Sequence, residues 1–276
     1  MLTLSSDFGS TYPAAMKGVI RQLSDAELLD VAHDLPRQSV RAGAFWLDQV
    51  LPYFPPAVHL AVVDPGVGTD RSALVVRAGD HALVGPDNGV LLPVARSLGE
   101  DDVEVFEVAV QGRGRQTDTS ASLTDGPPSP QDWPPDPASS TFHGRDVFAP
   151  TAARVHEAGI DAIEGMEAIA PTESYDDLQF PEPTIKDDGI IGTALAVDSF
   201  GNAITNVPGE VLADRFGDHL KVNGVWASAQ RTYANVEAGH RVITVGSHGN
   251  VELAVNRGRG DETFGISAGG RVRLYW

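Results

Sequence analysis

Two oppositely charged residues flank a glycine-rich turn early in the chain. Asp64 begins the run Asp-Pro-Gly-Val-Gly, and Arg71 follows shortly after it. Gly66 and Gly68 allow a turn tight enough to bring the two side chains together. The spacing alone fits a structural ion pair as well as a catalytic site, because either needs a carboxylate beside a guanidinium.

A single histidine stands in a second polar motif. His143 lies in the run Thr-Phe-His-Gly-Arg-Asp, where Gly144 leaves space beside it. An imidazole titrates near neutral pH and can exchange a proton with a substrate. A lone histidine next to Phe142 is more often structural, however, and Asp146 is expected to be the N-cap of a following helix.

Acidic residues follow three predicted strands at the point where each strand ends. Asp7, Asp64 and Asp87 each stand in a polar turn that contains glycine. In open α/β sheets, ligands bind outside the carboxyl ends of the strands. One such aspartate would be interpreted as a helix cap, but three on separate strands favour a shared site. With His143 they could also ligate a divalent metal, as in phosphoesterases, although no His-x-His or Asp-x-His pair supports this.

The elements that must position these residues alternate between strand and helix. Apolar runs predict strands at residues 2–5, 28–31, 58–63, 73–76 and 82–84, and helical spacing predicts helices at residues 14–23, 40–51, 90–98 and 147–158. This alternation predicts an N-terminal α/β domain, residues 1–180, with a largely parallel central sheet. Residues 112–140 are expected to form a mobile surface insertion within it, because they are rich in Pro, Ser and Thr and poor in large apolar groups.

The pattern changes after a proline-rich run at residues 180–183. Short apolar runs between Gly, Asn and Asp turns predict strands at residues 189–197, 203–207, 219–222, 241–245, 251–255 and 272–275, with one helical stretch at 211–216. We therefore expect a C-terminal all-β barrel or sandwich of about five or six strands, residues 184–276. Turns at 198–202 and 255–256 could bind the edge of a purine, with Phe142, Phe200 and Tyr233 stacking on it. The alternative is that these residues are turn formers and core aromatics.

Composition excludes several classes of protein. Twenty Lys and Arg against 38 Asp and Glu give a net charge of −18, which disfavours nucleic-acid binding. The absence of cysteine excludes disulfides, thiolate zinc sites and a cysteine nucleophile. No apolar run approaches the roughly 20 residues of a membrane span and no signal peptide is visible, so we expect a cytoplasmic protein without a membrane partner. High acidity with scarce lysine predicts a halophilic source, where salt screens the repulsion.

Five motifs in the same order resemble one enzyme family. They occupy residues 6–9, 16–20, 59–69, 85–89 and 141–146, and the likeness extends through residues 198–202 and 247–256. The chain resembles the S-adenosyl-L-methionine (SAM) hydroxide adenosyltransferases, the SAM hydrolases related to fluorinase and chlorinase. The likeness covers nearly the whole chain outside residues 112–140. It implies an N-terminal α/β domain and a C-terminal β-barrel, assembled as a homotrimer with SAM between the N-terminal domain of one subunit and the C-terminal domain of its neighbour.

The resemblance also implies roles for individual residues. Asp64, Arg71 and His143 match the set that activates water, and Asp7 matches the carboxylate that holds both ribose hydroxyls. Ser247 matches a contact to the methionine carboxylate. The adenine pocket and its surroundings are matched by Phe142, Asp198, Phe200, Asn202, Tyr233, Val255 and Asn256. The chain departs from the family at Ser10-Thr11-Tyr12, where an acid is usual, and at residues 257–261, where small neutral residues are commoner.

The implied reaction is attack of water or hydroxide on the ribose C5′ of SAM, giving adenosine and L-methionine. The sulfonium leaves as a neutral thioether, so the resemblance implies neither a general acid nor a metal or other cofactor. An ordinary aspartate is a weak base, so Asp64 is expected to orient the water, with the final proton acceptor left open. A halogenase is disfavoured because a carboxylate would repel a halide. A SAM- or nucleoside-binding protein without turnover and a metal-dependent phosphoesterase are the remaining alternatives.

Overall fold

Continuous buried runs form the central strands of the first part of the molecule. The structure is a computed structural model that describes residues 1–111, 131–137 and 139–276. All five residues of β1 (Leu2–Ser6) and all five of β3 (Val58–Val62) are buried. Strands buried on both faces lack polar alternation because helices cover the sheet on each side. The chain divides into two units, Met1–Leu178 and Gln179–Trp276.

The first unit contains a seven-stranded sheet in the order β2-β1-β3-β5-β4-β6-β7. The pairings β2–β1, β1–β3 and β3–β5 are parallel, as the sequence predicted, whereas β5–β4, β4–β6 and β6–β7 are antiparallel. The remaining strands are β2 (Leu28–Ala32), β4 (Ala73–Ala78), β5 (His81–Pro86), β6 (Val103–Val108) and β7 (Ile169–Pro171). β5 therefore lies between β3 and β4, although it follows both in the chain.

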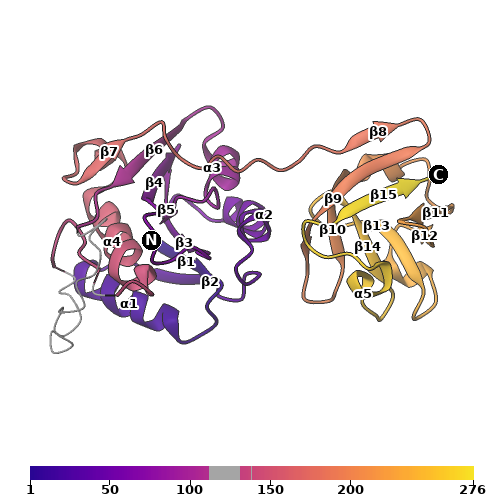
Figure 1. The fold of residues 1–276 in the computed structure, drawn as a ribbon, viewed down its shortest axis with the longest axis horizontal. Helices are drawn as coiled ribbons and strands as arrows, with labels where there is room; N and C mark the ends of the chain where they lie inside the picture. The colour runs from indigo at the N-terminus through magenta and orange to yellow at the C-terminus, as the bar shows by residue number, and fades with distance from the viewer. Residues whose placement is uncertain (112–130, 138) are drawn as a thin grey trace. The chain divides into compact units, whose positions relative to one another are not determined.

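Helices pack against both faces of this sheet. α1 (Tyr12–Leu23) contacts α4 (Ala149–Ala158), and α2 (Val40–Val50) contacts α3 (Leu92–Gly99); the two pairs lie on opposite sides in Figure 1. Short helical turns occupy Leu51–Tyr53 and Ile160–Gly165, and a π-helical turn, η2 (Gly144–Phe148), precedes α4. None of the helices in the described residues is long and apolar enough to cross a bilayer.

The second unit is a closed barrel of seven strands. Its order is β10-β14-β13-β12-β11-β15-β9, and β9 pairs with β10 to complete the ring, while β8 adds to β9 outside it. The strands are β8 (Thr184–Lys186), β9 (Gly189–Val197), β10 (Ala203–Pro208), β11 (His219–Val222), β12 (Val225–Ala229), β13 (Arg241–Val245), β14 (Asn250–Val255) and β15 (Arg271–Tyr275). The predicted barrel is confirmed, with β12 as a ring strand beyond those expected.

Short helical turns complete the second unit. They are η4 (Gly209–Leu212), η5 (Tyr233–Asn235) and α5 (Gly260–Phe264). The helix expected at residues 211–216 is therefore only a 3-10 turn at its start. Leu212 is nevertheless buried in the barrel core, which explains the apolar spacing there.

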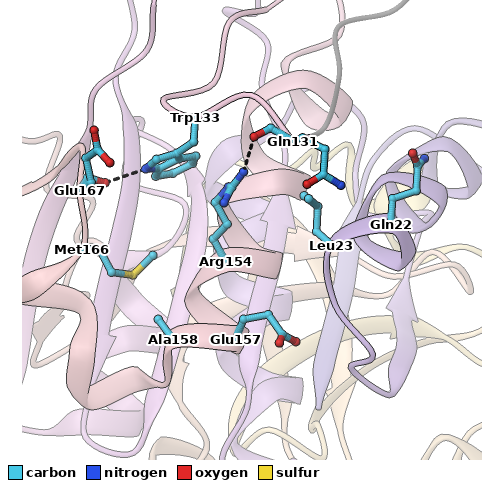
Figure 2. Close-up of a pocket in the computed structure, with 9 residues that line it drawn as sticks. All are labelled: Gln22, Leu23, Gln131, Trp133, Arg154, Glu157, Ala158, Met166 and Glu167. Atoms are coloured by element: carbon cyan, nitrogen blue, oxygen red, sulfur yellow. Dashed lines mark hydrogen bonds between the residues drawn. The ribbon is translucent and has the colours of Figure 1, made fainter.

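Most of the expected insertion at 112–140 lies outside the described residues. Residues 131–137 of this segment are described, and they pack against the rest of the first unit. The indole of Trp133 donates a hydrogen bond of 2.8 Å to the carbonyl of Glu167. The Arg154 guanidinium lies 5.0 Å from the Trp133 ring centroid. Figure 2 shows these residues around a pocket of about 430 Å³, which Leu23 and Met166 also line. Leu23 ends α1, so the pocket is at the amino end of the parallel strands, opposite the acidic turns.

Candidate active site

The carboxyl ends of three neighbouring parallel strands carry the three acids. β1, β3 and β5 are adjacent, and Asp7, Asp64 and Asp87 follow their last residues. β4 runs the other way, with Ala73 opposite Pro86 of β5, so the chain just before β4 returns to the same edge. Arg71 therefore reaches the aspartates because of the antiparallel strand, a reversal that the sequence alone did not predict.

Asp64 and Arg71 form a hydrogen-bonded ion pair at this edge. Nη1 of Arg71 donates to Oδ1 of Asp64 at 2.9 Å, and the Gly66 amide donates to the same oxygen at 3.1 Å. The Asp64 side chain is only 5% exposed, whereas that of Arg71 is 26% exposed. A Cβ on Gly66 would lie 2.4 Å from Nη2 of Arg71, so any larger residue at this position would displace the guanidinium from where it lies. Oδ2 of Asp64 accepts no hydrogen bond from the described residues.

The electrostatics of Asp64 connect it to two further candidates. Burial raises the pKa of the Asp64 carboxyl, and the Arg71 guanidinium and the Gly66 amide oppose that rise. His143 lowers this pKa and Asp7 raises it by charge interaction, so both lie within electrostatic reach of Asp64. Asp64, Arg71, His143 and Asp7 thus gather in one region, and the carboxylate at its centre is a stronger base than an exposed aspartate.

The segment that carries His143 is fixed by close backbone contacts. Gly68 has φ +85°, and a Cβ there would lie 2.5 Å from the carbonyl oxygen of Ser140, so the glycine-rich turn packs tightly on this segment. The sequence predicted Asp146 as a helix N-cap, and this prediction is wrong. Asp146 lies inside the π-helical turn η2, where its buried carboxylate accepts hydrogen bonds from the Arg145 guanidinium and from the amide of Ser139.

Asp7 is held by the loop after β2 and stands beside an aromatic cluster. Its Oδ2 accepts a hydrogen bond of 2.7 Å from the amide of Gln38. The rings of Phe8, Tyr12 and Phe142 meet edge to face, with centroids 5.2 to 6.3 Å apart. Tyr12 is 57% exposed, so the cluster borders solvent. Phe142 therefore lies near Asp7, where a bound nucleoside could meet both.

The Asp87 carboxylate, like those of Asp7 and Asp64, accepts a hydrogen bond from a backbone amide. It accepts a hydrogen bond of 2.7 Å from the amide of Asp176. Burial raises its pKa, and Arg71 opposes that rise. Among the described residues no three His, Asp or Glu side chains gather in a metal-binding group.

In the second unit, Asp198 organises the turn between β9 and β10. Its Oδ1 accepts hydrogen bonds from the amides of Phe200 and Asn202 at 2.9 and 2.8 Å, and its Oδ2 accepts one from Nδ2 of Asn202 at 2.9 Å. Asp198 is therefore a turn former, and it uses the side-chain donor of Asn202. The same turn leaves Phe200 77% exposed, which makes that ring available for stacking.

Tyr233 is anchored by a buried acid that the sequence did not indicate. Its hydroxyl donates a hydrogen bond to Oε1 of Glu252, which is 4% exposed. His248 Nε2 lies 3.9 Å from Oε2 of the same carboxylate. Val251 and Leu253 belong to the barrel core, so Glu252 between them points to the outer face, beneath Tyr233. Burial raises the pKa of Glu252.

Asn256 and Ser247 lie at opposite ends of the β13–β14 hairpin. Asn256 follows Val255, which pairs with Arg241, whereas Ser247 is exposed in the turn that joins the strands. Nδ2 of Asn256 donates to the carbonyl of Val236 at 2.7 Å, so its side chain supports the preceding loop. Val255 and Asn256 therefore lie on the side of the Asp198 turn, and Ser247 is separated from them by the length of the hairpin.

Comparison with known proteins assigns the family. The sequence model of the SAM hydroxide adenosyltransferase N-terminal domain matches residues 2–164, and that of the C-terminal domain matches residues 192–273. The chain belongs to the SAM hydroxide adenosyltransferase family. The resemblance found in the motifs is therefore confirmed, and the two matched segments fall in the two units of the fold.

Curated relatives and solved structures cover the chain almost completely. The (R)-S-adenosyl-L-methionine hydrolase of Salinispora tropica is 37% identical over 278 residues, which span 99% of this chain and 97% of that one. The (R)-S-adenosyl-L-methionine hydrolase of Thermus thermophilus is 38% identical over 276 residues, or 98% and 97% of the two chains. The crystal structure of an uncharacterized conserved protein from Thermotoga maritima is similar with a TM-score of 0.76, at 28% identity and 100% coverage of both chains.

Three residues near the candidate site, Glu252, His33 and Gln38, were not identified from the sequence. Glu252 stands in an apolar strand, where the alternation of core and outer positions could have flagged it as a buried acid. His33 and Gln38 follow β2 at the same edge of the sheet as Asp7, and no motif drew attention to them. Their contacts join residues distant in the chain, so only the folded structure reveals them.

Proposed function

We propose that the protein hydrolyses SAM to adenosine and L-methionine by attack of water at the ribose C5′. The observation that carries this proposal is the partly buried Asp64–Arg71 pair, with His143 and Asp7 acting on the same carboxylate. The hydrolase names of relatives that match nearly the whole chain support it. SAM is the substrate, and the proposal includes no metal or other cofactor.

The leaving group needs no protonation, because the sulfonium departs as a neutral thioether. Oxygen of water forms a bond to C5′ while the C5′–S bond breaks, and its electron pair neutralises the sulfonium as methionine forms. The proton of the water must then be removed. The site therefore has to hold one water in line with the C5′–S bond and accept its proton.

Asp64 suits both tasks in this proposal. Its Oδ1 is occupied by Arg71 and Gly66, which leaves Oδ2 to accept a hydrogen bond from the water. Burial raises the pKa of Asp64, so it accepts the proton more readily than an exposed carboxylate. Arg71 fixes the carboxylate, and His143 orients the water from the other side or takes the proton onward.

Substrate binding is divided between the two units. Asp7 is proposed to hold the ribose diol, with Phe142 nearby. Phe200 and Tyr233 supply exposed rings for the adenine, supported by Asp198, Asn202, Val255 and Asn256. Ser247 is assigned to the methionine carboxylate. These assignments follow the family pattern, and the exposed Phe200 ring is the structural feature that fits them best.

We further propose a homotrimer with each active site at a subunit interface. The water-activating and adenine-binding candidates belong to different units, and an exposed Phe200 fits a ring that is covered on assembly. We assign residues 1–180 and 184–276 as the two domains. The net charge of −18 supports a halophilic cytoplasm as the setting.

The test is product analysis in water enriched in oxygen-18. Protein incubated with SAM in concentrated KCl should give equal amounts of adenosine and methionine, with the label in the 5′-hydroxyl of adenosine. Unlabelled adenosine would refute attack by water at C5′. SAM binding without products would support the sensor alternative, and 5′-halo-adenosine in chloride would support a halogenase. Asp64→Asn, which keeps the shape of the side chain, should slow product formation by about 10² or more.

A further inference from the structure

Four side chains form a hydrogen-bonded series that begins at Ser6, the last residue of β1. Ser6 Oγ lies 2.8 Å from Nδ1 of His33, and Nε2 of His33 lies 3.1 Å from Oδ1 of Asp30. Oδ2 of Asp30 accepts a hydrogen bond of 2.9 Å from Lys17. A carboxylate can only accept, so Nε2 of His33 carries the hydrogen of its bond to Asp30.

The order serine, histidine, aspartate is that of a nucleophilic triad, but the geometry does not allow that role. Ser6 is 0% exposed, because it ends the buried strand β1. No substrate carbon can reach its hydroxyl. The series must therefore act on the structure around Ser6 rather than on a substrate directly.

The residue next to Ser6 is the proposed ribose ligand. Three hydrogen bonds join this segment to the loop after β2: the Gly9 amide to the His33 carbonyl at 2.8 Å, the Leu35 amide to the Ser6 carbonyl at 3.2 Å, and the Gln38 amide to Oδ2 of Asp7 at 2.7 Å. The backbone thus aligns the two loops. Among the described residues, the His33 ring supplies the side-chain hydrogen bond to Ser6, and Ser6 immediately precedes Asp7.

We propose that His33 is a positioning residue that holds the Asp7 carboxylate in place for the ribose diol of the substrate. This inference rests on the proposed function. The hydrogen bond to Asp30 orients the His33 ring, and the ring in turn holds Ser6. His33 therefore fixes the end of β1, which Asp7 follows. His33 is 16% exposed, whereas Asp30 and Lys17 are 49% and 34% exposed, so the contribution should weaken toward the surface.

Diol recognition supplies a direct readout of Asp7 placement. The probes are adenosine and 2′,3′-dideoxyadenosine as inhibitors of SAM turnover, and the quantity is the ratio of their inhibition constants. If Asp7 holds both hydroxyls, the wild-type protein prefers adenosine, and Asp7→Ala loses that preference. His33→Ala should reduce the ratio by about tenfold or more, because a hydrogen bond to a misplaced carboxylate is largely lost.

Two substitutions distinguish the hydrogen bond that His33 makes to Ser6 from the size of its side chain. Asn places a polar atom near the position of Nδ1, whereas Gln places one near Nε2. His33→Asn should therefore keep the Ser6 contact and retain most of the ratio, while His33→Gln should behave like His33→Ala. In an Asp7→Ala background, His33→Ala should change the ratio no further, because both substitutions act through one carboxylate.

A second Ser–His pair in the same unit provides the matched control. His156 Nδ1 lies 3.1 Å from Ser24 Oγ, near the amino end of the strands. His156→Ala removes a comparable contact and should leave the ratio unchanged, even if it lowers the melting temperature as much as His33→Ala. If the wild-type protein is active and His33→Ala leaves the ratio of inhibition constants unchanged, the role of His33 is refuted and the proposed function stands. No SAM turnover by the wild-type protein overturns the proposed function instead.

Discussion

Arg71 reaches Asp64 through space that only the missing side chain of Gly66 leaves open. The guanidinium donates to Oδ1 at 2.9 Å, and a Cβ at residue 66 would lie 2.4 Å from Nη2. The pair is therefore set by the backbone of the turn as much as by the two charges. This relationship makes the site sensitive to changes that leave both charged residues in place.

Replacing Gly66 with alanine should lower the activity of the protein without unfolding it. The new methyl group must displace the guanidinium, so Arg71 no longer holds Asp64, while the turn itself is half-exposed and tolerates the change. We expect kcat to fall by about tenfold or more, as for other losses of catalytic orientation. Gly18→Ala is the matched control, because a Cβ there meets nothing within 4 Å. Equal activity of the two variants would contradict the steric argument.

Asp64→Asn should lower kcat by about 10² to 10⁴, the range attributed to a positioned general base. The amide keeps the hydrogen-bonding shape but accepts no proton. Adenosine formation from SAM is the measurement, with Asp161→Asn at an exposed position as the control. If Asp64→Asn keeps more than about a tenth of the wild-type rate, Asp64 only orients the water, and another group takes the proton.

The acidic limb of the activity profile should report the raised pKa of Asp64. Burial holds this pKa above the ordinary value of 3.8, so the carboxylate takes up a proton, and activity falls, at a higher pH than for an exposed aspartate. Arg71 opposes the rise. Arg71→Gln should therefore move the limb to still higher pH, whereas Arg71→Lys, which keeps the charge, should move it less. The measurement is kcat/KM against pH, and a shift toward lower pH in Arg71→Gln would be inconsistent with this electrostatic account.

A buried histidine, His59, should make the first unit sensitive to acid. His59 accepts or donates with Thr3 at 2.8 Å and with His81 at 2.9 Å, and burial lowers the pKa of His59 to about 3. The neutral ring belongs to the folded state. Its contribution to stability is thus complete above pH 6.5 and is lost as the pH falls from 6.5 toward 3, by up to about 1.4 kcal/mol per pH unit.

His59→Asn tests this linkage, because asparagine can still contact Thr3 but does not titrate. Urea unfolding at pH 7 and pH 5, followed by the signal of the first unit, should show a smaller loss of unfolding free energy in the variant. The variant is expected to be less stable at pH 7, since its smaller side chain leaves space in the core. Equal losses in the two proteins would refute the role of His59.

Local pattern carried much of the sequence prediction. The buried runs of β1 and β3 and the acids that follow them were recognisable because consecutive residues specify a buried strand and its turn. β12, whose residues Val225–Ala229 mix exposed and buried positions, gave a weaker signal. The insertion of β5 between β3 and β4 was out of reach, because strand order depends on pairing between distant segments.

The site divides in the same way. Asp64, Arg71 and His143 stood in recognisable motifs, and a glycine-rich turn suggested the ion pair directly. The partners that fix other candidates are distant in sequence: Glu252 holds Tyr233, and Gln38 holds Asp7. Asp198 and Asn202 bond to each other, which a turn sequence permits but does not require. Long-range hydrogen bonds of this kind follow from the packing of whole elements.

The strand order has a consequence for how the molecule is made. β4 and β5 are antiparallel neighbours joined by a tight turn, so they can form a hairpin before either meets β3. The strand that occupies the middle is the last of the three to be synthesised, and the hairpin must dock with β5 innermost. A nascent chain that stops before Pro86 would possess both Asp64 and Arg71 but not the platform between them. The Asp64–Arg71 pair would then be positioned during biosynthesis only after that hairpin has docked, and His143, further along the chain, would complete the proposed water-activating set later still.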